Sequence, residues 1–424
     1  MPNPSPHHLP RMRRLLPVLA AISVGVVGLC LQDGNAASPR DGGMSRAEVF
    51  RQVTALTQLG AQMFRDPALS ASGKLACASC HSPEHAFGPP NDLPVQLGGV
   101  DLSQPGLRAV PSLKYLQAVP PFTEHFFESE DEGDESVDNG PTGGLTWDGR
   151  ADSGSEQVLI PLLSVFEMAN ASPADVVAKA RKAGYANAFR AIFGRAVFDS
   201  DDSAFKAIGK AFEVYEQDYA TFYPYSSKYD AFLAGKASLT PHEARGLTLF
   251  NDPAKGNCAE CHISKRANDG EPPQFTDYGM IALGAPRNQA LPVNADPAYF
   301  DMGLCGPLRT DLSKHTEYCG LFRTPSLRNV ATRSTFFHNG IYHSLKQVLE
   351  FYVQRDTNPE RFYPRTPDGT VRKYDDLPSA FHKNITEEAP FNRHPGDRPA
   401  LDDAEIDDVI AFLQTLTDGY TPTK

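Results

Sequence analysis

Cys77-Ala-Ser-Cys-His81 is the most informative segment of this 424-residue chain. Two cysteines three positions apart, followed at once by a histidine, form the attachment signature of a c-type haem. The thiols of Cys77 and Cys80 can each bond one vinyl group of a porphyrin. His81 then becomes the proximal ligand of the iron.

The same signature returns at Cys258-Ala-Glu-Cys-His262. A single copy could also be half of a zinc site, but two copies without further CxxC partners indicate two covalent c-type haems. In the second copy Cys258 and Cys261 are the attachment residues and His262 is the proximal ligand.

Similar helices are predicted before both motifs. Ser45-Arg-Ala-Glu48 is a capping box that opens a helix to about Phe64, and Thr240-Pro-His-Glu243 opens a second helix that ends near Phe250. The two approaches share a series of residues, in which Gly60, Phe64, Asp66 and Pro67 correspond to Gly246, Phe250, Asp252 and Pro253. This repetition indicates an internal duplication.

The sequence predicts a mainly α fold of two cytochrome c-like helical haem domains, at residues 37–230 and 231–424, with long irregular connections. Further helices are expected at 172–193, 202–215 and 344–353, and an irregular segment at 263–320. The last helix begins near Asp402, and its apolar positions form one face: Ile406, Val409, Ile410, Leu413 and Leu416.

Residues 1–36 differ in character from the rest of the chain. Three arginines precede an apolar run from Leu15 to Leu31, and small residues follow up to Ala36. This pattern predicts a cleaved secretory signal peptide and export to the periplasm. A retained membrane anchor is the alternative, because the run approaches spanning length. After cleavage no stable membrane insertion is expected.

Charge and cysteine usage agree with an exported protein. The net charge of −12 disfavours nucleic acid as a partner. Cys305 and Cys319 are the cysteines that neither the signal nor the haem motifs use, and they suggest one disulfide in an oxidising compartment.

Several blocks outside the haem motifs resemble the bacterial di-haem cytochrome c peroxidase family. The resemblance runs from about Ser45 to Tyr420 and is closest to the MauG/MbnH-like branch. The blocks are Trp147-Asp-Gly-Arg150, Glu156-Gln157, Phe166-Glu-Met168, Thr324-Pro-Ser-Leu-Arg-Asn329 and His338-Asn-Gly340.

Two departures from ordinary members indicate the MauG-like branch. Ordinary members cap the N-terminal haem with a His about sixteen residues past the first motif, but Leu97 lies near that position here, and His85 comes too early. Ordinary members also place a Met on the second haem, fourteen residues after the His of the His-Asn-Gly block. Counted from His338, that position is Tyr352, and the resemblance implies a Tyr ligand.

The resemblance also implies roles for residues that have plainer explanations. Glu167 matches the acid–base carboxylate of the peroxide site, although a Glu there could be a surface residue. Pro161 and Gln157 match neighbours of that site, and both could be ordinary helix-boundary residues. Trp147, the one tryptophan of the chain, matches the ring between the haems, although a lone Trp is usually a core residue.

A calcium site between the domains is implied less clearly. Ala109 stands where the family has an Asn, and Arg333-Ser-Thr335 replaces a Thr-x-Pro segment. A cationic side chain beside the site makes calcium binding doubtful.

Together these features predict a periplasmic di-haem peroxidase. Hydrogen peroxide is reduced at an open haem, and the oxidising equivalents are shared with a second His/Tyr haem. The electrons come from a periplasmic protein, which is either a protein substrate that is modified or a c-type cytochrome that donates electrons. The alternative is a di-haem electron-transfer protein without peroxidase activity.

Overall fold

The computed structural model describes residues 44–126, 139–267 and 270–422. The predicted signal peptide, residues 1–36, lies outside the described residues. The chain divides into two compact units, Met1–Ser45 and Arg46–Lys424. The second unit holds every element named below.

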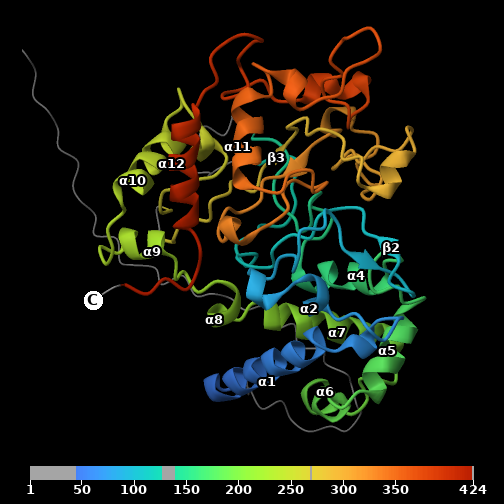
Figure 1. Cartoon of the computed structure of the whole chain (residues 1–424). Coiled ribbons are helices and arrows are strands. Elements are labelled where there is room, and N and C mark those ends of the chain that lie inside the picture. Colours follow the sequence, from blue (N-terminus) through green and yellow to red (C-terminus); the bar gives the residue numbers. More distant parts are fainter. Residues whose placement is uncertain (1–43, 127–138, 268–269, 423–424) are drawn as a thin grey trace, which may run out of the picture. The chain divides into compact units, whose positions relative to one another are not determined.

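The described part of the chain is mainly helical, which confirms the predicted fold class (Figure 1). The helices before residue 225 are α1 (Arg46–Phe64), α2 (Cys77–Cys80), α3 (Gly154–Gln157), α4 (Leu159–Leu163), α5 (Pro173–Lys182), α6 (Ala186–Phe193), α7 (Asp201–Glu216) and α8 (Tyr219–Phe222). Those after it are α9 (Lys228–Leu233), α10 (Pro241–Asn251), α11 (Leu345–Gln354) and α12 (Asp403–Gln414).

Four short strands form two antiparallel pairs, β1 (Leu97–Gly98) with β2 (Gln104–Pro105), and β3 (Met280–Ile281) with β4 (Phe322–Arg323). The helix predicted at 172–193 is wrong as a single element, because the chain is extended at Ala183 and restarts as α6. Gly184 follows this break, and glycine is a poor residue for a helix interior.

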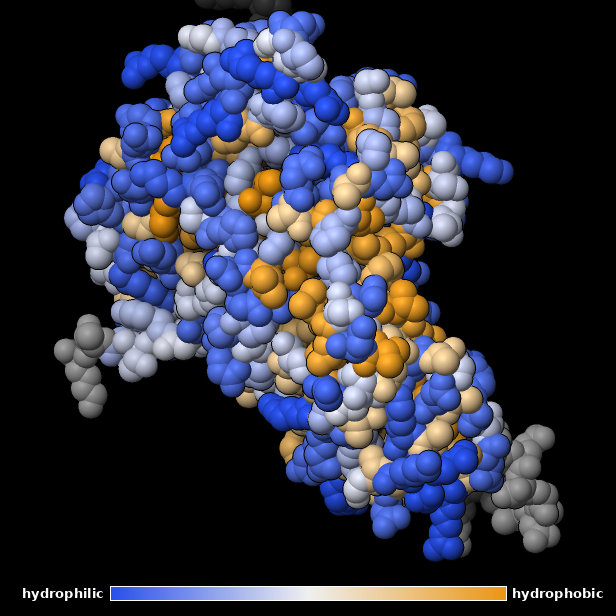
Figure 2. All heavy atoms as spheres, turned by 45° about the vertical axis from the view of Figure 1, so that its right-hand side comes forward, coloured by the Kyte–Doolittle hydropathy of each residue, from blue (hydrophilic) through white to orange (hydrophobic). Residues whose placement is uncertain are grey.

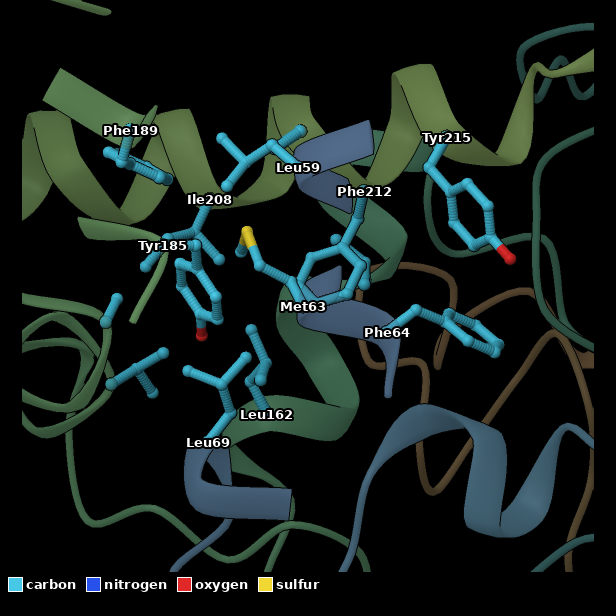
Figure 3. Packing of buried hydrophobic residues seen from close by; sticks show 14 of the residues in the cluster. Leu59, Met63, Phe64, Leu69, Leu162, Tyr185, Phe189, Ile208, Phe212 and Tyr215 are labelled. Atoms are coloured by element: carbon cyan, nitrogen blue, oxygen red, sulfur yellow. The ribbon is translucent and has the colours of Figure 1, made fainter. Parts of the chain in front are cut away.

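The first hydrophobic cluster is built mainly on α1 and α7. Figure 3 shows the side chains of α1 and α7 pointing toward one another. Helix α1 contributes Leu59, Met63 and Phe64, and α7 contributes Ile208, Phe212 and Tyr215. Residues from other elements complete this core. The helices cross closely at Gly60, where an added Cβ would lie 2.2 Å from the backbone oxygen of Ala211.

The second cluster has a matching crossing. Helices α10 and α12 lie side by side (Figure 1), and a Cβ added at Gly246 would lie 2.0 Å from the backbone oxygen of Asp408. Both helices begin with capping boxes, on Thr240 as the sequence predicts, and on Asp402, where the sequence predicts the start of the helix. The two crossings agree with an internal duplication, which itself stays a prediction.

The close crossings give a first testable expectation. Gly60→Ala should lower the free energy of unfolding by about 1–3 kcal/mol, because the backbone of α7 has to move away from the new methyl group. Urea unfolding of the haem-loaded protein, followed by circular dichroism, measures the change. Gly184→Ala is the matched control, since nothing lies within 4 Å of its Cβ. Equal stability of the two variants would contradict the assigned crossing.

Two residues that lie between α2 and α3 in the sequence, Arg108 and Tyr115, contact distant parts of the chain. Arg108 forms ion pairs with Asp148 at 2.8 Å and with Asp301 at 2.6 Å. Tyr115 donates a hydrogen bond to Asp418 at 2.6 Å. The domain boundary near residue 230 stays a prediction, and these contacts place Arg108 and Tyr115 against the later part of the chain.

The segment 263–320 is largely irregular, as predicted, and its disulfide is present between Cys305 and Cys319. Both sulfur-bearing side chains are buried. Among the described residues no helix is both long and apolar enough to cross a membrane.

Candidate functional site

The first haem motif is a single turn of helix that orients His81. Helix α2 carries Cys77 and Cys80, and the backbone N–H of His81 donates to the Cys77 carbonyl at 2.8 Å. Its ring Nδ1 lies 3.1 Å from the carbonyl oxygen of Phe87. Nδ1 is therefore the donor, and Nε2 is left with a lone pair for a metal. Burial lowers the pKa of His81 to about 4, so the imidazole is neutral.

The second motif repeats this geometry. The backbone N–H of His262 donates to Cys258 at 2.8 Å, and Nδ1 of His262 lies 2.9 Å from the carbonyl oxygen of Phe275. Phe87 and Phe275 both have positive φ, of 56° and 55°. A non-glycine residue seldom adopts this conformation. The same uncommon turn therefore presents the carbonyl to both histidines.

A cavity of about 240 Å³ joins the second motif to residues from other parts of the chain. Its wall includes Cys258, Cys261 and His262, together with Trp147 and Tyr352. The sequence-predicted residues of the second haem site and the single tryptophan therefore meet in one place.

Tyr352 lies on α11 and is held among aromatic rings. The ring of Phe337 is parallel to it at 6.2 Å between centroids, and the ring of Phe391 lies at 5.3 Å. Burial raises the pKa of the Tyr352 phenol well above its ordinary value. A phenol in such surroundings becomes a phenolate only next to a compensating positive charge such as ferric iron.

Trp147 is fixed by hydrogen bonds at both ends of the residue. Its indole Nε1–H donates to the Ala109 carbonyl at 2.8 Å, and its own carbonyl accepts from the backbone N–H of Arg323 at 2.8 Å. Asp148 beside it is fully buried and pairs with Arg108 and Arg150. This ionic cluster explains why the Trp-Asp-Gly-Arg block keeps a rigid position at the cavity.

Glu167 lies in a tight loop beside the first motif. The loop is held by hydrogen bonds from Gly99 N–H to the Glu167 carbonyl at 2.9 Å, and from Ala71 N–H to the Met168 carbonyl at 2.8 Å. The Glu167 side chain is exposed, yet burial among surrounding atoms raises its pKa, while Ser164 and Arg150 oppose the rise.

The charge of Glu167 reaches the haem-binding thiols. Burial raises the pKa of the Cys80 thiol to about 11, and the negative charge of Glu167 adds to the rise. The charge of Glu167 therefore acts on both cysteines of the first haem motif.

Gln157 and Pro161 lie on the two short helices that precede this loop, α3 and α4. The Pro161 carbonyl accepts a hydrogen bond from Met168 N–H at 3.1 Å, which brackets Glu167. Both residues are half-buried.

Leu97 also lies near Glu167, on β1. A Cβ added to the neighbouring Gly98 would lie 2.7 Å from the Glu167 Cα. The exposed large apolar side chains around this loop are Leu93, Leu97, Val100 and Val165. Apolar residues also gather across the middle of the face in Figure 2, between hydrophilic regions.

The residues present fit two covalent haems. The thiols of Cys77, Cys80, Cys258 and Cys261 take part in no disulfide. In both proximal histidines Nδ1 lies against a backbone carbonyl, which leaves Nε2 as the nitrogen that would bind iron. The described residues contain no group of three His, Cys, Asp or Glu side chains suited to a metal ion. In the predicted calcium region the Arg333 guanidinium donates to the Val110 carbonyl at 3.0 Å and to the Thr335 carbonyl at 3.2 Å.

Some residues of the site were not found from the sequence. Phe87 and Phe275 act through backbone carbonyls, which no side-chain pattern reveals. Asp301 lies far from Arg108 in the chain and joins it only through the fold. Asp148 could have been found from the sequence, since it directly follows Trp147 in the Trp147-Asp-Gly-Arg150 block.

Comparisons with known proteins agree with this geometry. Residues 54–238 match the family model of the di-haem cytochrome c peroxidases. The methylamine utilization protein MauG of Paracoccus denitrificans is 33% identical over 378 residues, which cover 87% of this chain and 90% of that protein. Cytochrome c551 peroxidase of Nitrosomonas europaea is 25% identical, with 75% and 81% covered. The crystal structure of the diheme peroxidase BthA from Burkholderia thailandensis gives a TM-score of 0.76 at 40% identity, with 86% of each chain covered.

The chain therefore belongs to the di-haem cytochrome c peroxidase family. It carries two covalently bound c-type haems and is an oxidoreductase that acts on peroxide. Within the family it is similar to MauG, as the sequence predicts.

Proposed function

We propose that this protein reduces hydrogen peroxide at the haem held by Cys77, Cys80 and His81, with Glu167 as the acid–base residue. The main support is the position of Glu167, whose charge acts on the Cys80 thiol. Glu167 also lies in the loop that packs against β1, where Leu97 takes the place of a haem-capping histidine.

The chemistry requires two protons and two electrons for each peroxide, which yields two molecules of water. Haem supplies the binding position for peroxide and stores the two oxidising equivalents. Glu167 would accept a proton from one oxygen of the peroxide and donate it to the other oxygen, which leaves as water. Burial raises the pKa of Glu167 toward the range in which a carboxyl both accepts and donates a proton.

The position near Leu97 supports an open haem. A leucine cannot ligate iron, and it lies next to the Glu167 loop in a strand. Gln157 and Pro161 lie on α3 and α4, the two short helices that precede this loop. We propose that both residues shape the peroxide site.

Tyr352 and Trp147 support different roles for the two haems. We propose that His262 and Tyr352, which line the same cavity, would both bind the iron of the second haem. A phenolate is anionic and favours high oxidation states of iron, so this haem can share an oxidising equivalent. Trp147 lies on the same cavity wall, and its oxidisable ring shortens the electron path between the haems.

We further propose that the protein acts in the periplasm on a protein partner, either by modifying it or by accepting its electrons. The predicted signal peptide, the covalent haems and the Cys305–Cys319 disulfide support this compartment. The net charge of −12 favours a partner with a basic face.

A peroxide titration of the haem-loaded ferric protein tests the proposal. The resting spectrum should contain a high-spin component from the His81 haem and a low-spin component from the His262 haem, and one equivalent of peroxide should change both. A spectrum that is entirely low-spin and indifferent to peroxide would favour the di-haem electron carrier instead.

A further inference from the structure

Four tyrosines that the mechanism does not use form a continuous group of rings. The ring of Tyr115 lies 5.2 Å from that of Tyr225, measured between centroids. Tyr225 in turn lies 6.4 Å from Tyr219 and 6.5 Å from Tyr223, and these two are 5.3 Å apart. Each ring therefore has a neighbour close enough for short-range electron transfer.

The two ends of this group are in different surroundings. Tyr115 is 1% exposed and lines the same cavity as Trp147 and His262. Tyr219, at the start of α8, is 56% exposed. The group therefore leads from the wall of the haem cavity to the surface.

The inner tyrosine has a proton acceptor in place. The phenol of Tyr115 donates to Asp418 Oδ1 at 2.6 Å, while Lys114 and Asn329 donate to Asp418 Oδ2 at 3.0 and 2.8 Å. A phenol that loses an electron becomes a much stronger acid. Asp418 can take the proton when Tyr115 is oxidised and return it when Tyr115 is reduced.

The phenol of Tyr225 is also surrounded by polar groups. The amide nitrogens of Gln117 and Gln274 lie 3.0 and 2.8 Å from its oxygen, and both amide oxygens lack a partner among the described residues. The Gln274 nitrogen also donates to the Pro272 carbonyl at 3.0 Å, so exchange of oxygen and nitrogen fits these positions only in Gln117. This exchange gives Tyr225 an acceptor for its own proton.

A cation lies between the two inner rings. The Arg328 guanidinium lies 4.6 Å from the ring centroid of Tyr115 and 4.8 Å from that of Tyr225. Its charge is balanced by Asp230, through two hydrogen bonds of 3.0 and 2.9 Å. The pair keeps the two rings in position and leaves little net charge to oppose oxidation of the phenols.

We propose that Tyr115, Tyr225 and Tyr219 form a relay that delivers electrons from a surface donor to the haem cavity, with Tyr223 beside the outer step. This inference rests on the proposed function, because peroxide supplies the oxidant. The substrate class is a one-electron donor that reaches Tyr219 at the surface. Each donor loses one electron, and two passages through the relay return the two equivalents that one peroxide removes.

Radical trapping in the haem-loaded protein tests the relay. Peroxide is added without reductant but with a nitroso spin trap, and mass spectrometry locates the adducts. Freeze-quench electron paramagnetic resonance follows the tyrosyl signal. The wild type should give an adduct on Tyr219. Tyr225→Phe should reduce this adduct at least tenfold and prolong the oxidised haem spectrum, because the path is interrupted.

Two further variants keep the outcome interpretable. Tyr219→Phe changes an exposed ring and should remove the surface adduct without affecting the fold. Tyr374→Phe, outside the relay, should behave like the wild type. If peroxide oxidises the haems but the Tyr219 adduct is absent, or survives in Tyr225→Phe, the relay is wrong. If peroxide leaves the haem spectrum unchanged, the proposed function itself fails, and the relay with it.

Discussion

Glu167→Gln should lower the second-order rate of reaction with peroxide by about 10²–10⁴-fold, the usual contribution of a positioned acid–base group. The amide keeps the size of the side chain but cannot carry a proton between the two peroxide oxygens. Stopped-flow absorption of the ferric haem-loaded variant measures the rate directly. The resting spectrum should remain that of the wild type, because Glu167 is not an iron ligand in this scheme.

Glu360→Gln is a suitable control. Glu360 is an exposed carboxylate away from both haem motifs, and its loss should leave the rate unchanged. A Glu167→Gln protein that reacts with peroxide as fast as this control would remove Glu167 from the mechanism. The assignment of the reactive haem to His81 would then also lose its main support.

Tyr352→Phe should convert the low-spin ferric component of the second haem to a high-spin one. The phenyl ring fills the same space among Phe337 and Phe391 but has no oxygen to donate to iron. The oxidised state formed with peroxide should also decay at least tenfold faster, since the anionic ligand that favours high oxidation states is gone. Absorption and electron paramagnetic resonance spectra at low temperature measure both effects.

Tyr342→Phe is the matched comparison. Tyr342 is a half-buried tyrosine near Phe337, and its hydroxyl has no hydrogen-bond partner among the described residues. Its removal should leave the low-spin component in place. An unchanged spectrum in Tyr352→Phe would show that another side chain binds the second iron.

The elements with strong local signals could be predicted from the sequence. Capping boxes located the starts of α1 and α10, and the last helix begins near Asp402 as predicted. The apolar face of α12 is buried as expected, at Ile406, Val409 and Leu413. The haem motifs fixed the attachment residues and required no tertiary information, because attachment depends on neighbouring residues in the chain.

The remaining features depend on contacts between distant segments. The prediction of a single helix at 172–193 was wrong, because the backbone is extended at Ala183 and the helix ends there. The carbonyls of Phe87 and Phe275 reach the histidines through a positive-φ backbone conformation, which the sequence does not predict for an aromatic residue. The tyrosines of the relay are close in sequence after residue 218, but Tyr115 reaches them only through the fold.

Asp418 also has a consequence for how the protein is made. This one carboxylate binds Lys114, Tyr115 and Asn329, and a ribosome adds it after all three. The joint between these segments therefore forms only after Asp418 has been synthesised, when both cysteine motifs are already part of the chain.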